Sequence, residues 1–221
     1  MQLTRDEFDK KYKNGTLKIA FVGMSNIGKS FRAEELEKEK NFEKFSVDDF
    51  IGQSLAVDGI NDLASWMGFP YDEKFEKNQA EYLKKEAFYT QNALKDFQGG
   101  KNFVLDTTGS VVYLDEETLN FLKDNFLIVG FKVPENLLED MVENFFKTPK
   151  PIVWGKHFNQ QDGESKKEAL KRNYPHLLKW RSARYEKLAD VSLETYTHDP
   201  NAILSCDDFL SLLREQLEQE S

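Results

Sequence analysis

The stretch Gly23-Met24-Ser25-Asn26-Ile27-Gly28-Lys29-Ser30 has the residue types and spacing of a loop that binds the phosphates of a nucleotide. It fits the pattern G-x-x-x-x-G-K-[ST], it follows an apolar run at residues 17–22, and it precedes a charged segment at residues 31–40. The two glycines let several backbone N–H groups point at one phosphate chain, at the positive end of the next helix. The stretch therefore predicts a phosphate-binding loop between a strand and a helix.

Two side chains of this loop carry separate parts of the expected chemistry. Lys29 is expected to reach the β- and γ-phosphates of ATP, and Ser30 is expected to offer its hydroxyl to Mg²⁺. The nucleotide-binding residues predicted from the motif are Gly23, Ser25, Asn26, Ile27, Gly28, Lys29, Ser30 and Phe31.

Acidic residues follow two further apolar runs. Asp48 and Asp49 come after residues 45–47, and Asp106 comes after residues 103–105. Ligands of open parallel sheets bind outside the carboxyl ends of the strands, so Asp48 is a candidate for positioning a substrate and Asp106 for holding Mg²⁺. Aspartate is also a preferred helix cap, so one acid of the first pair is expected to cap a helix starting near Phe50 and the other to be functional.

The remaining chain must place these residues together. Apolar runs at residues 17–22, 45–47, 103–106, 126–132 and 191–193 predict strands, and the segments at 4–13, 30–40, 51–67, 72–97, 115–123, 134–147, 175–189 and 207–220 predict helices. Because strands alternate with helices, the sequence predicts an α/β fold with a parallel sheet and helices on both faces. We expect a single domain over residues 1–221.

Residues 148–174 differ from the rest of the chain. They include Pro149, Pro151 and Gly155, many lysines and no sustained apolar period. Connections of this length are commonly lids, and phosphoryl transfer requires that water be excluded, so a basic mobile lid is predicted, with Lys156 as a candidate to contact the phosphates. An ordinary solvated loop is the alternative. Pro175 is expected to open the following helix.

Composition limits the classes of function. The chain has 221 residues and a net charge of −9, which argues against a nucleic-acid surface. The histidines, at positions 157, 176 and 198, lack ligand-like spacing, which argues against zinc. Cys206 is the single cysteine, so an internal disulfide is excluded. The first residues do not resemble a signal peptide, and no apolar run approaches the ~20 residues of a membrane span. We expect a soluble, cytoplasmic monomer.

With these pieces in order, the chain resembles the shikimate kinase family of small P-loop kinases from about Leu17 to Leu213. The string at residues 180–190 resembles the family's pattern of Arg, then Tyr, Glu and Ala-Asp before the last strand, here Arg181, Tyr185, Glu186 and Ala189-Asp190. Residues 104–112, 150–153 and 199–202 are also similar to the family.

The resemblance implies a five-stranded sheet, ATP in the phosphate loop and attack of a substrate hydroxyl on the γ-phosphate. It implies that Asp48 orients this hydroxyl and accepts its proton, that Arg181 pairs with a substrate carboxylate, and that Gly109 lies in the substrate turn. It also implies that Lys150 and Pro200 enclose the adenine ring.

The departures from the family fall on the acceptor side. Ser46 stands where the family has a first acid, and Asp106 is expected to replace that acid from the neighbouring strand. The family's triple glycine is Thr108-Gly109-Ser110, whose side chains are expected to crowd or contact the acceptor, and its second substrate arginine corresponds loosely to Leu83.

The leading hypothesis is an ATP- and Mg²⁺-dependent kinase for the hydroxyl of a small molecule, either shikimate or a related carboxylated polyol. Two alternatives stay open. The first is an ATP-binding regulatory protein without transfer chemistry, and the second is a kinase of the nucleotide or gluconate type.

Overall fold

The computed structural model describes residues 2–134, 138–147, 150–194 and 203–218. Its sheet has five strands, β1 (Lys18–Gly23), β2 (Phe42–Ser46), β3 (Asn102–Asp106), β4 (Leu127–Phe131) and β5 (Val191–Leu193). The strand order is β2-β3-β1-β4-β5 and every neighbouring pair is parallel. The five-stranded parallel sheet predicted from the sequence is confirmed.

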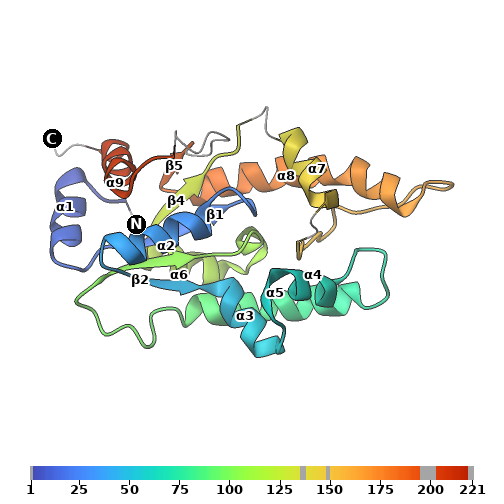
Figure 1. Cartoon of the computed structure of the whole chain (residues 1–221), viewed down its shortest axis with the longest axis horizontal. Coiled ribbons are helices and arrows are strands. Elements are labelled where there is room, and N and C mark those ends of the chain that lie inside the picture. The colour runs from blue at the N-terminus through green and yellow to red at the C-terminus, as the bar shows by residue number, and fades with distance from the viewer. Residues whose placement is uncertain (1, 135–137, 148–149, 195–202, 219–221) are drawn as a thin grey trace.

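Burial explains why these segments are strands of a parallel sheet. All residues of β3 and β4 are buried, as are Ile19 to Gly23 of β1. Strands covered on both faces are typically continuous apolar runs, because no position along them faces water. Helices supply this cover, with α2 (Lys29–Glu39) in front of the strands and α6 (Glu116–Asn125) behind them in Figure 1.

The other described helices surround this sheet. They are α1 (Arg5–Lys13), α3 (Val47–Leu55), α4 (Gly59–Met67), α5 (Phe75–Gln91), α7 (Leu138–Lys147), α8 (Lys166–Leu188) and α9 (Cys206–Glu215), with a short 3₁₀ helix, η1, at Val111–Tyr113. None of the described helices combines the length and apolar character needed to cross a bilayer.

Helix caps mark where three helices begin, and one of them corrects an expectation. Thr4 caps α1 in a capping box, and Asp115 caps α6 by accepting from the Thr118 N–H at 2.8 Å. The cap of α3, however, is Ser46, whose hydroxyl accepts from the Asp49 N–H at 3.4 Å. The prediction that Asp48 or Asp49 caps this helix was wrong, because the helix begins at Val47 and both acids lie in its first turn.

Helix α8 begins earlier than expected. The prediction placed its start at Pro175, but the helix starts at Lys166, and Pro175 lies inside it. Ser165 and Glu168 form a capping box, which fixes the beginning of the helix nine residues before the proline. A proline inside a helix removes one N–H donor without ending the helix when the surrounding packing is strong enough.

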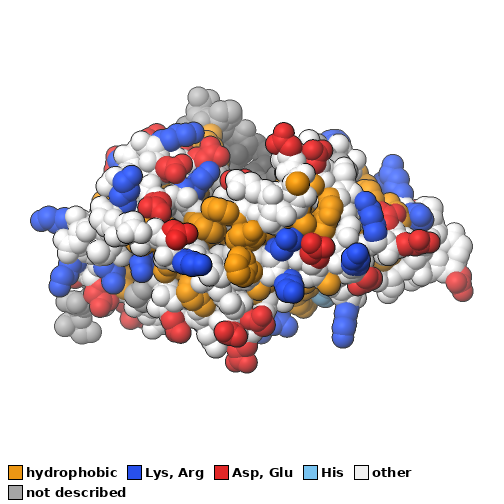
Figure 2. Space-filling view, turned by 90° about the horizontal axis from the view of Figure 1, so that it is seen from below, with side chains coloured by type: hydrophobic (Ala, Val, Ile, Leu, Met, Phe, Trp, Pro, Cys, Tyr) orange, Lys and Arg blue, Asp and Glu red, His pale blue; other side chains and the backbone are white. Residues whose placement is uncertain are grey.

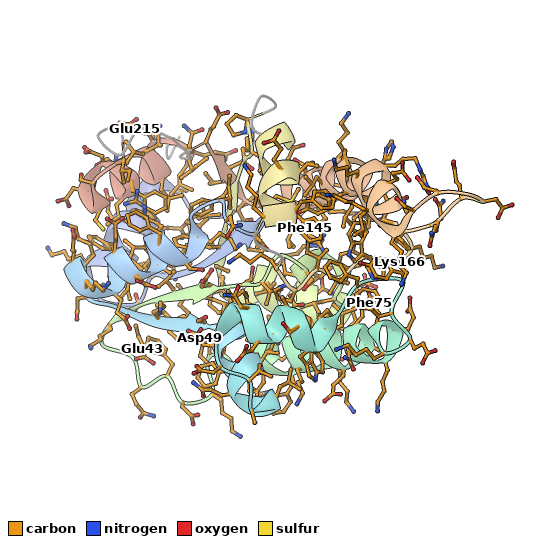
Figure 3. All side chains as sticks on the ribbon, turned by 45° about the vertical axis from the view of Figure 1, so that its right-hand side comes forward. Glu43, Asp49, Phe75, Phe145, Lys166 and Glu215 are labelled. Atoms are coloured by element: carbon orange, nitrogen blue, oxygen red, sulfur yellow. The ribbon has the colours of Figure 1, made fainter. Side chains whose placement is uncertain are left out.

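Residues 150–158, the first described part of the predicted lid, are packed rather than solvated. Trp154 is buried, with its ring 6.3 Å from that of Phe145 and 5.6 Å from that of Phe158. The Gln79 side chain of α5 accepts from the Trp154 N–H at 2.7 Å and from the Gly155 N–H at 2.9 Å. Phe145 on α7 lies at this end of the molecule (Figure 3). That the segment opens and closes stays a prediction.

A cluster of aromatic side chains also lies at the surface. Phe50 of α3 stacks on Phe45 at 4.3 Å and on Tyr89 at 5.6 Å, and Phe88 is exposed beside them. Figure 2 shows hydrophobic side chains gathered on the face of the molecule seen from below.

Candidate active site

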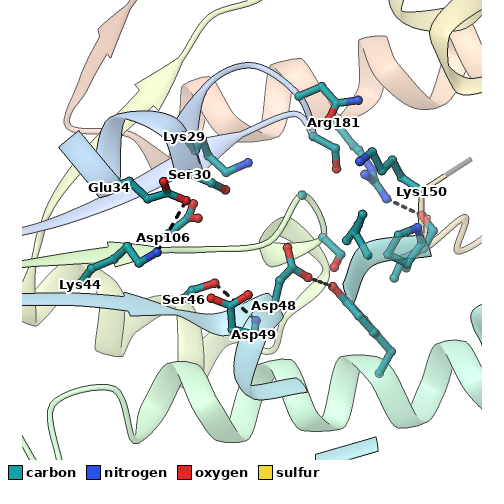
Figure 4. Close-up of a pocket in the computed structure, with 18 residues that line it drawn as sticks. Lys29, Ser30, Glu34, Lys44, Ser46, Asp48, Asp49, Asp106, Lys150 and Arg181 are labelled. Carbon is teal, nitrogen blue, oxygen red and sulfur yellow. Dashed lines mark hydrogen bonds and ion pairs between the residues drawn. The ribbon is translucent and has the colours of Figure 1, made fainter. Parts of the chain in front are cut away.

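A pocket of about 260 Å³ opens at the carboxyl ends of β1, β2 and β3 (Figure 4). Its lining combines residues that are far apart in the sequence. They are Ser25, Asn26, Lys29, Ser30, Glu34, Lys44, Ser46, Asp48, Asp49, Ile60, Tyr82, Asp106, Gly109, Ser110, Lys150, Pro151, Val153 and Arg181. The position of the pocket agrees with the rule that open parallel sheets bind ligands outside the carboxyl ends of their strands.

The phosphate loop forms one wall of this pocket. Gly28 has a φ of 100°, a left-handed conformation that favours glycine, and α2 starts at the next residue. Lys29 is only 6 % exposed, and its ammonium donates to the carbonyls of Gly23 at 3.1 Å and Met24 at 3.0 Å. Burial lowers the pKa of Lys29, and the nearby carboxylate of Asp106 opposes this shift. The loop therefore brings a partly desolvated cation to the pocket.

Asp106, the predicted ligand of Mg²⁺, lies in the pocket. It ends β3, beside Phe21 of β1 and Ser46 of β2 in the sheet register. Burial raises the pKa of its carboxyl, and Lys29 and a hydrogen bond with Ser30 oppose the shift. Its Oδ1 atom is buried and has no hydrogen-bond partner among the described residues. A buried carboxylate oxygen without a partner, next to a serine hydroxyl, fits a hard cation such as Mg²⁺.

The opposite wall carries Asp48. The Tyr82 hydroxyl of α5 donates to Asp48 Oδ1 at 2.6 Å (Figure 4). Burial raises the pKa of Asp48, while the hydrogen bond from Tyr82 and the charge of Lys29 lower it. Tyr82 was not among the predicted site residues, because its spacing in the helix indicated a core residue. It is indeed buried, but its hydroxyl reaches the pocket.

The turn at residues 107–110 connects the two walls. The Thr107 hydroxyl donates to the carbonyl of Phe21 at 2.6 Å, and the Tyr185 hydroxyl of α8 donates to the carbonyl of Gly109. A Cβ atom on Gly109 would lie 2.9 Å from Ser25 Oγ and 3.5 Å from Arg181 Nη1. A side chain at this position would therefore displace the Ser25 hydroxyl where the turn approaches the phosphate loop.

The hydroxyls of Thr108 and Ser110 are bound within the protein. Thr108 Oγ1 donates to Glu86 Oε1 at 2.6 Å, and Ser110 Oγ donates to the other carboxylate oxygen of Glu86. The two hydroxyl oxygens are 2.8 Å apart. Glu86 therefore holds both hydroxyls, while Ser110 also lines the pocket; that these side chains crowd or contact the acceptor stays a prediction. Glu86, which lies one helical turn after Tyr82 on α5, was not among the predicted site residues either.

Arg181 reaches the same pocket from α8. Its side chain is 4 % exposed, and Nη2 donates to the carbonyl of Val153 at 2.5 Å. The guanidinium lies 5.3 Å from the centre of the Tyr113 ring, and Nε is buried without a hydrogen-bond partner among the described residues. The structure thus places Arg181 and Asp48, which are far apart in sequence, in one pocket.

Some predicted nucleotide-binding residues lie away from the pocket lining. Ile27 is buried and Phe31 is exposed. The carbonyl of Gly23 accepts a hydrogen bond from the Lys29 ammonium. Lys150, predicted to enclose adenine, lines the pocket beside Pro151. Pro200 lies outside the described residues.

The predicted phosphate contact Lys156 and the acceptor-side position Leu83 can be placed as well. Lys156 is exposed and does not line this pocket, whereas Lys150 does. Leu83 packs against the hydrophobic core and is absent from the lining, so this position contributes no cation to the site. A further cation from β2, Lys44, lies 3.9 Å from Glu34 near Asp106.

Comparisons with known proteins show a likeness in structure. No family model matches the chain, and no curated protein matches it in sequence. A shikimate kinase from Acinetobacter baumannii, solved in complex with shikimate, matches at a TM-score of 0.62 with 17 % identity, over 92 % of this chain and 96 % of that one. A shikimate kinase from Bacteroides thetaiotaomicron matches at 0.57 with 15 % identity, over 90 % and 97 %. At these identities the likeness concerns the fold, and the chain has a shikimate kinase-like P-loop fold.

Proposed function

We propose that this protein transfers the γ-phosphoryl group of ATP to a hydroxyl of a small molecule, with shikimate or a related carboxylated polyol as the acceptor. The observation that carries the proposal is that Lys29 and Ser30 of the phosphate loop face Asp48 across one pocket, with Asp106 between them (Figure 4). Phosphoryl transfer depends on positioning and electrostatic stabilisation, and this arrangement offers both.

On the donor side, the loop amides and Lys29 would bind the phosphates and stabilise the charge that develops on the moving group. Ser30 and Asp106 would hold Mg²⁺, which supplies neutralisation of the phosphate oxygens when it is bound. Among the described residues, no group of three or more His, Cys, Asp or Glu side chains is placed to hold a metal. Few protein ligands suit Mg²⁺, because this ion usually keeps several waters and binds substrate phosphates.

On the acceptor side, Asp48 would orient the attacking hydroxyl and take its proton. The raised pKa of this carboxyl, caused by burial, makes it a better proton acceptor than an exposed aspartate. Tyr82 would hold one oxygen of Asp48 so that the other faces the acceptor. Arg181, with its buried Nε, would contact the acceptor carboxylate.

The experiment is a turnover assay with ATP and Mg²⁺ on shikimate and on a panel of sugar acids, polyols, nucleosides and gluconate. Phosphorylation of shikimate or of another carboxylated polyol supports the proposal. Turnover restricted to nucleosides or gluconate would favour a kinase of another acceptor class. Binding of ATP without phosphorylation of any compound would favour a regulatory ATP-binding protein.

A further inference from the structure

Glu86 of α5 is a buried carboxylate without a cationic partner at ion-pair distance among the described residues. Its side chain is 0 % exposed, and both of its oxygens accept hydrogen bonds from hydroxyls, those of Thr108 and Ser110. Burying a carboxylate costs much more than burying an apolar side chain of the same size. Packing alone therefore does not explain a glutamate at this position.

The hydrogen bonds of Glu86 fix the turn at residues 108–110. Thr108 Oγ1 also accepts from the Ser110 N–H at 2.9 Å, so the carboxylate fixes the backbone of the turn as well as its side chains. The turn held by Glu86 lines the same pocket as Asp48, through Gly109 and Ser110. The Tyr82 hydroxyl, one helical turn before Glu86 on α5, donates to Asp48. Helix α5 therefore supplies one side chain that holds the turn and another that holds the carboxylate facing the phosphate loop.

The groups that face Glu86 come from several elements. Asp48 of α3 disfavours the ionised form of Glu86, and Arg181 of α8 favours that form. The charge of Glu86 in turn contributes to the raised pKa of Tyr82 on α5, of which burial is the largest cause. Lys29 of α2 and Tyr185 of α8 also interact with Glu86 electrostatically. Burial is the largest influence and raises the pKa of Glu86 to about 7.

We propose that Glu86 is a positioning residue for the acceptor, because its carboxylate holds the turn at 108–110, which lines the pocket together with Asp48. This inference rests on the proposed function and deepens it. Gly109 lies against Ser25 of the phosphate loop, so a shift of the turn would also shift the acceptor relative to the γ-phosphate. A misplacement of about 1 Å in such a site can lower the rate by about 100-fold.

The test compares Glu86→Gln with Glu81→Gln. Glu81 is a matched control, since it lies on the same helix, its side chain is 44 % exposed, and it approaches Lys85 at 3.9 Å. Glu86→Gln should lower kcat/KM for the acceptor by about tenfold or more and leave KM for ATP within about twofold of the wild type. Glu81→Gln should match the wild type. Unchanged acceptor kinetics in Glu86→Gln, or parallel losses for ATP and the acceptor, would overturn the inference.

Ser110→Ala supplies a second test of the same network. If Glu86 acts through the turn, adding Ser110→Ala to Glu86→Gln should cause little further loss, because the effects of residues in one network are not additive. If the double variant loses as much kcat/KM as the product of the two single losses, the proposed coupling between Glu86 and the turn is contradicted.

Hydrogen exchange separates this inference from the proposed function. A wild-type protein that phosphorylates no compound in the panel would refute the proposed function by itself. In that case the exchange of backbone amides in residues 107–113 decides the inference. Faster exchange in Glu86→Gln than in Glu81→Gln supports the hold of Glu86 on the turn, and equal exchange in the two variants overturns it.

Discussion

Replacing Glu86 by glutamine should change how the stability of the protein depends on pH. The pKa of Glu86 rises from 4.5 to about 7 in the folded state because the carboxyl is buried. The folded state therefore binds more protons than the unfolded state between these values, and the free energy of unfolding falls as pH rises through this window. From about pH 5 to about pH 8, the loss attributable to Glu86 is about 2 to 3 kcal/mol.

Glutamine cannot ionise. From about pH 5 to about pH 8, the free energy of unfolding should therefore fall by about 2 to 3 kcal/mol less in Glu86→Gln than in the wild type. Urea denaturation at both pH values, followed by circular dichroism, measures this difference. Glu81→Gln is the control, because an exposed glutamate on the same helix should leave the pH dependence as in the wild type. If the free energy of unfolding depends on pH in the same way in the wild type and in Glu86→Gln, the buried carboxyl of Glu86 is not the cause of the pH dependence.

Three further substitutions test separate contacts of the site. Tyr82→Phe removes the hydroxyl that donates to Asp48, so the free energy of unfolding, measured by urea denaturation near neutral pH, should fall by about 1 to 2 kcal/mol. The loss should not be larger, because the half-buried Asp48 carboxylate keeps some access to water. Gly109→Ala places a Cβ atom 2.9 Å from Ser25 Oγ, and the same assay should show a loss of about 1 to 3 kcal/mol that Ser25→Ala partly relieves; a full loss in the double variant would contradict the contact. Asp106→Asn should raise the Mg²⁺ concentration needed for half-maximal turnover by about tenfold or more, and an unchanged Mg²⁺ titration would exclude Asp106 as a ligand.

The parts of the fold that could be predicted are those encoded over short distances. The phosphate loop occupies eight consecutive residues between a buried strand and a helix, so its pattern is visible without knowledge of the fold. Asp106 was predictable for a similar reason, since it directly follows an apolar run. The capping boxes at Thr4 and Ser165 are equally local. The second marks the beginning of α8, which the prediction placed at Pro175 because proline commonly opens a helix.

The acceptor network could not be predicted, because it depends on how helices pack. The contact between Tyr82 and Asp48 joins α5 to α3, and a hydroxyl at the edge of a buried stripe looks like a core residue in the sequence. One pattern could have indicated it. The buried residues of α5 are Phe75, Gln79, Tyr82, Glu86 and Thr90, a helical stripe in which three members are polar and non-aromatic. Polar residues on a buried stripe require partners, and here Gln79 and Glu86 bind the segments that line the pocket.

The most direct test of the central claim is transfer of the labelled γ-phosphoryl group of ATP to the acceptor panel by wild type, Lys29→Ala and Lys38→Ala. Lys38 is a matched control, because it lies on the same helix and its exposed ammonium forms an ion pair with the exposed Glu34 at 3.4 Å. Our account predicts a labelled acceptor with the wild type and Lys38→Ala, and loss of labelling by about 100-fold or more in a folded Lys29→Ala. Labelling that is equal in all three proteins, or absent from all three, would contradict it.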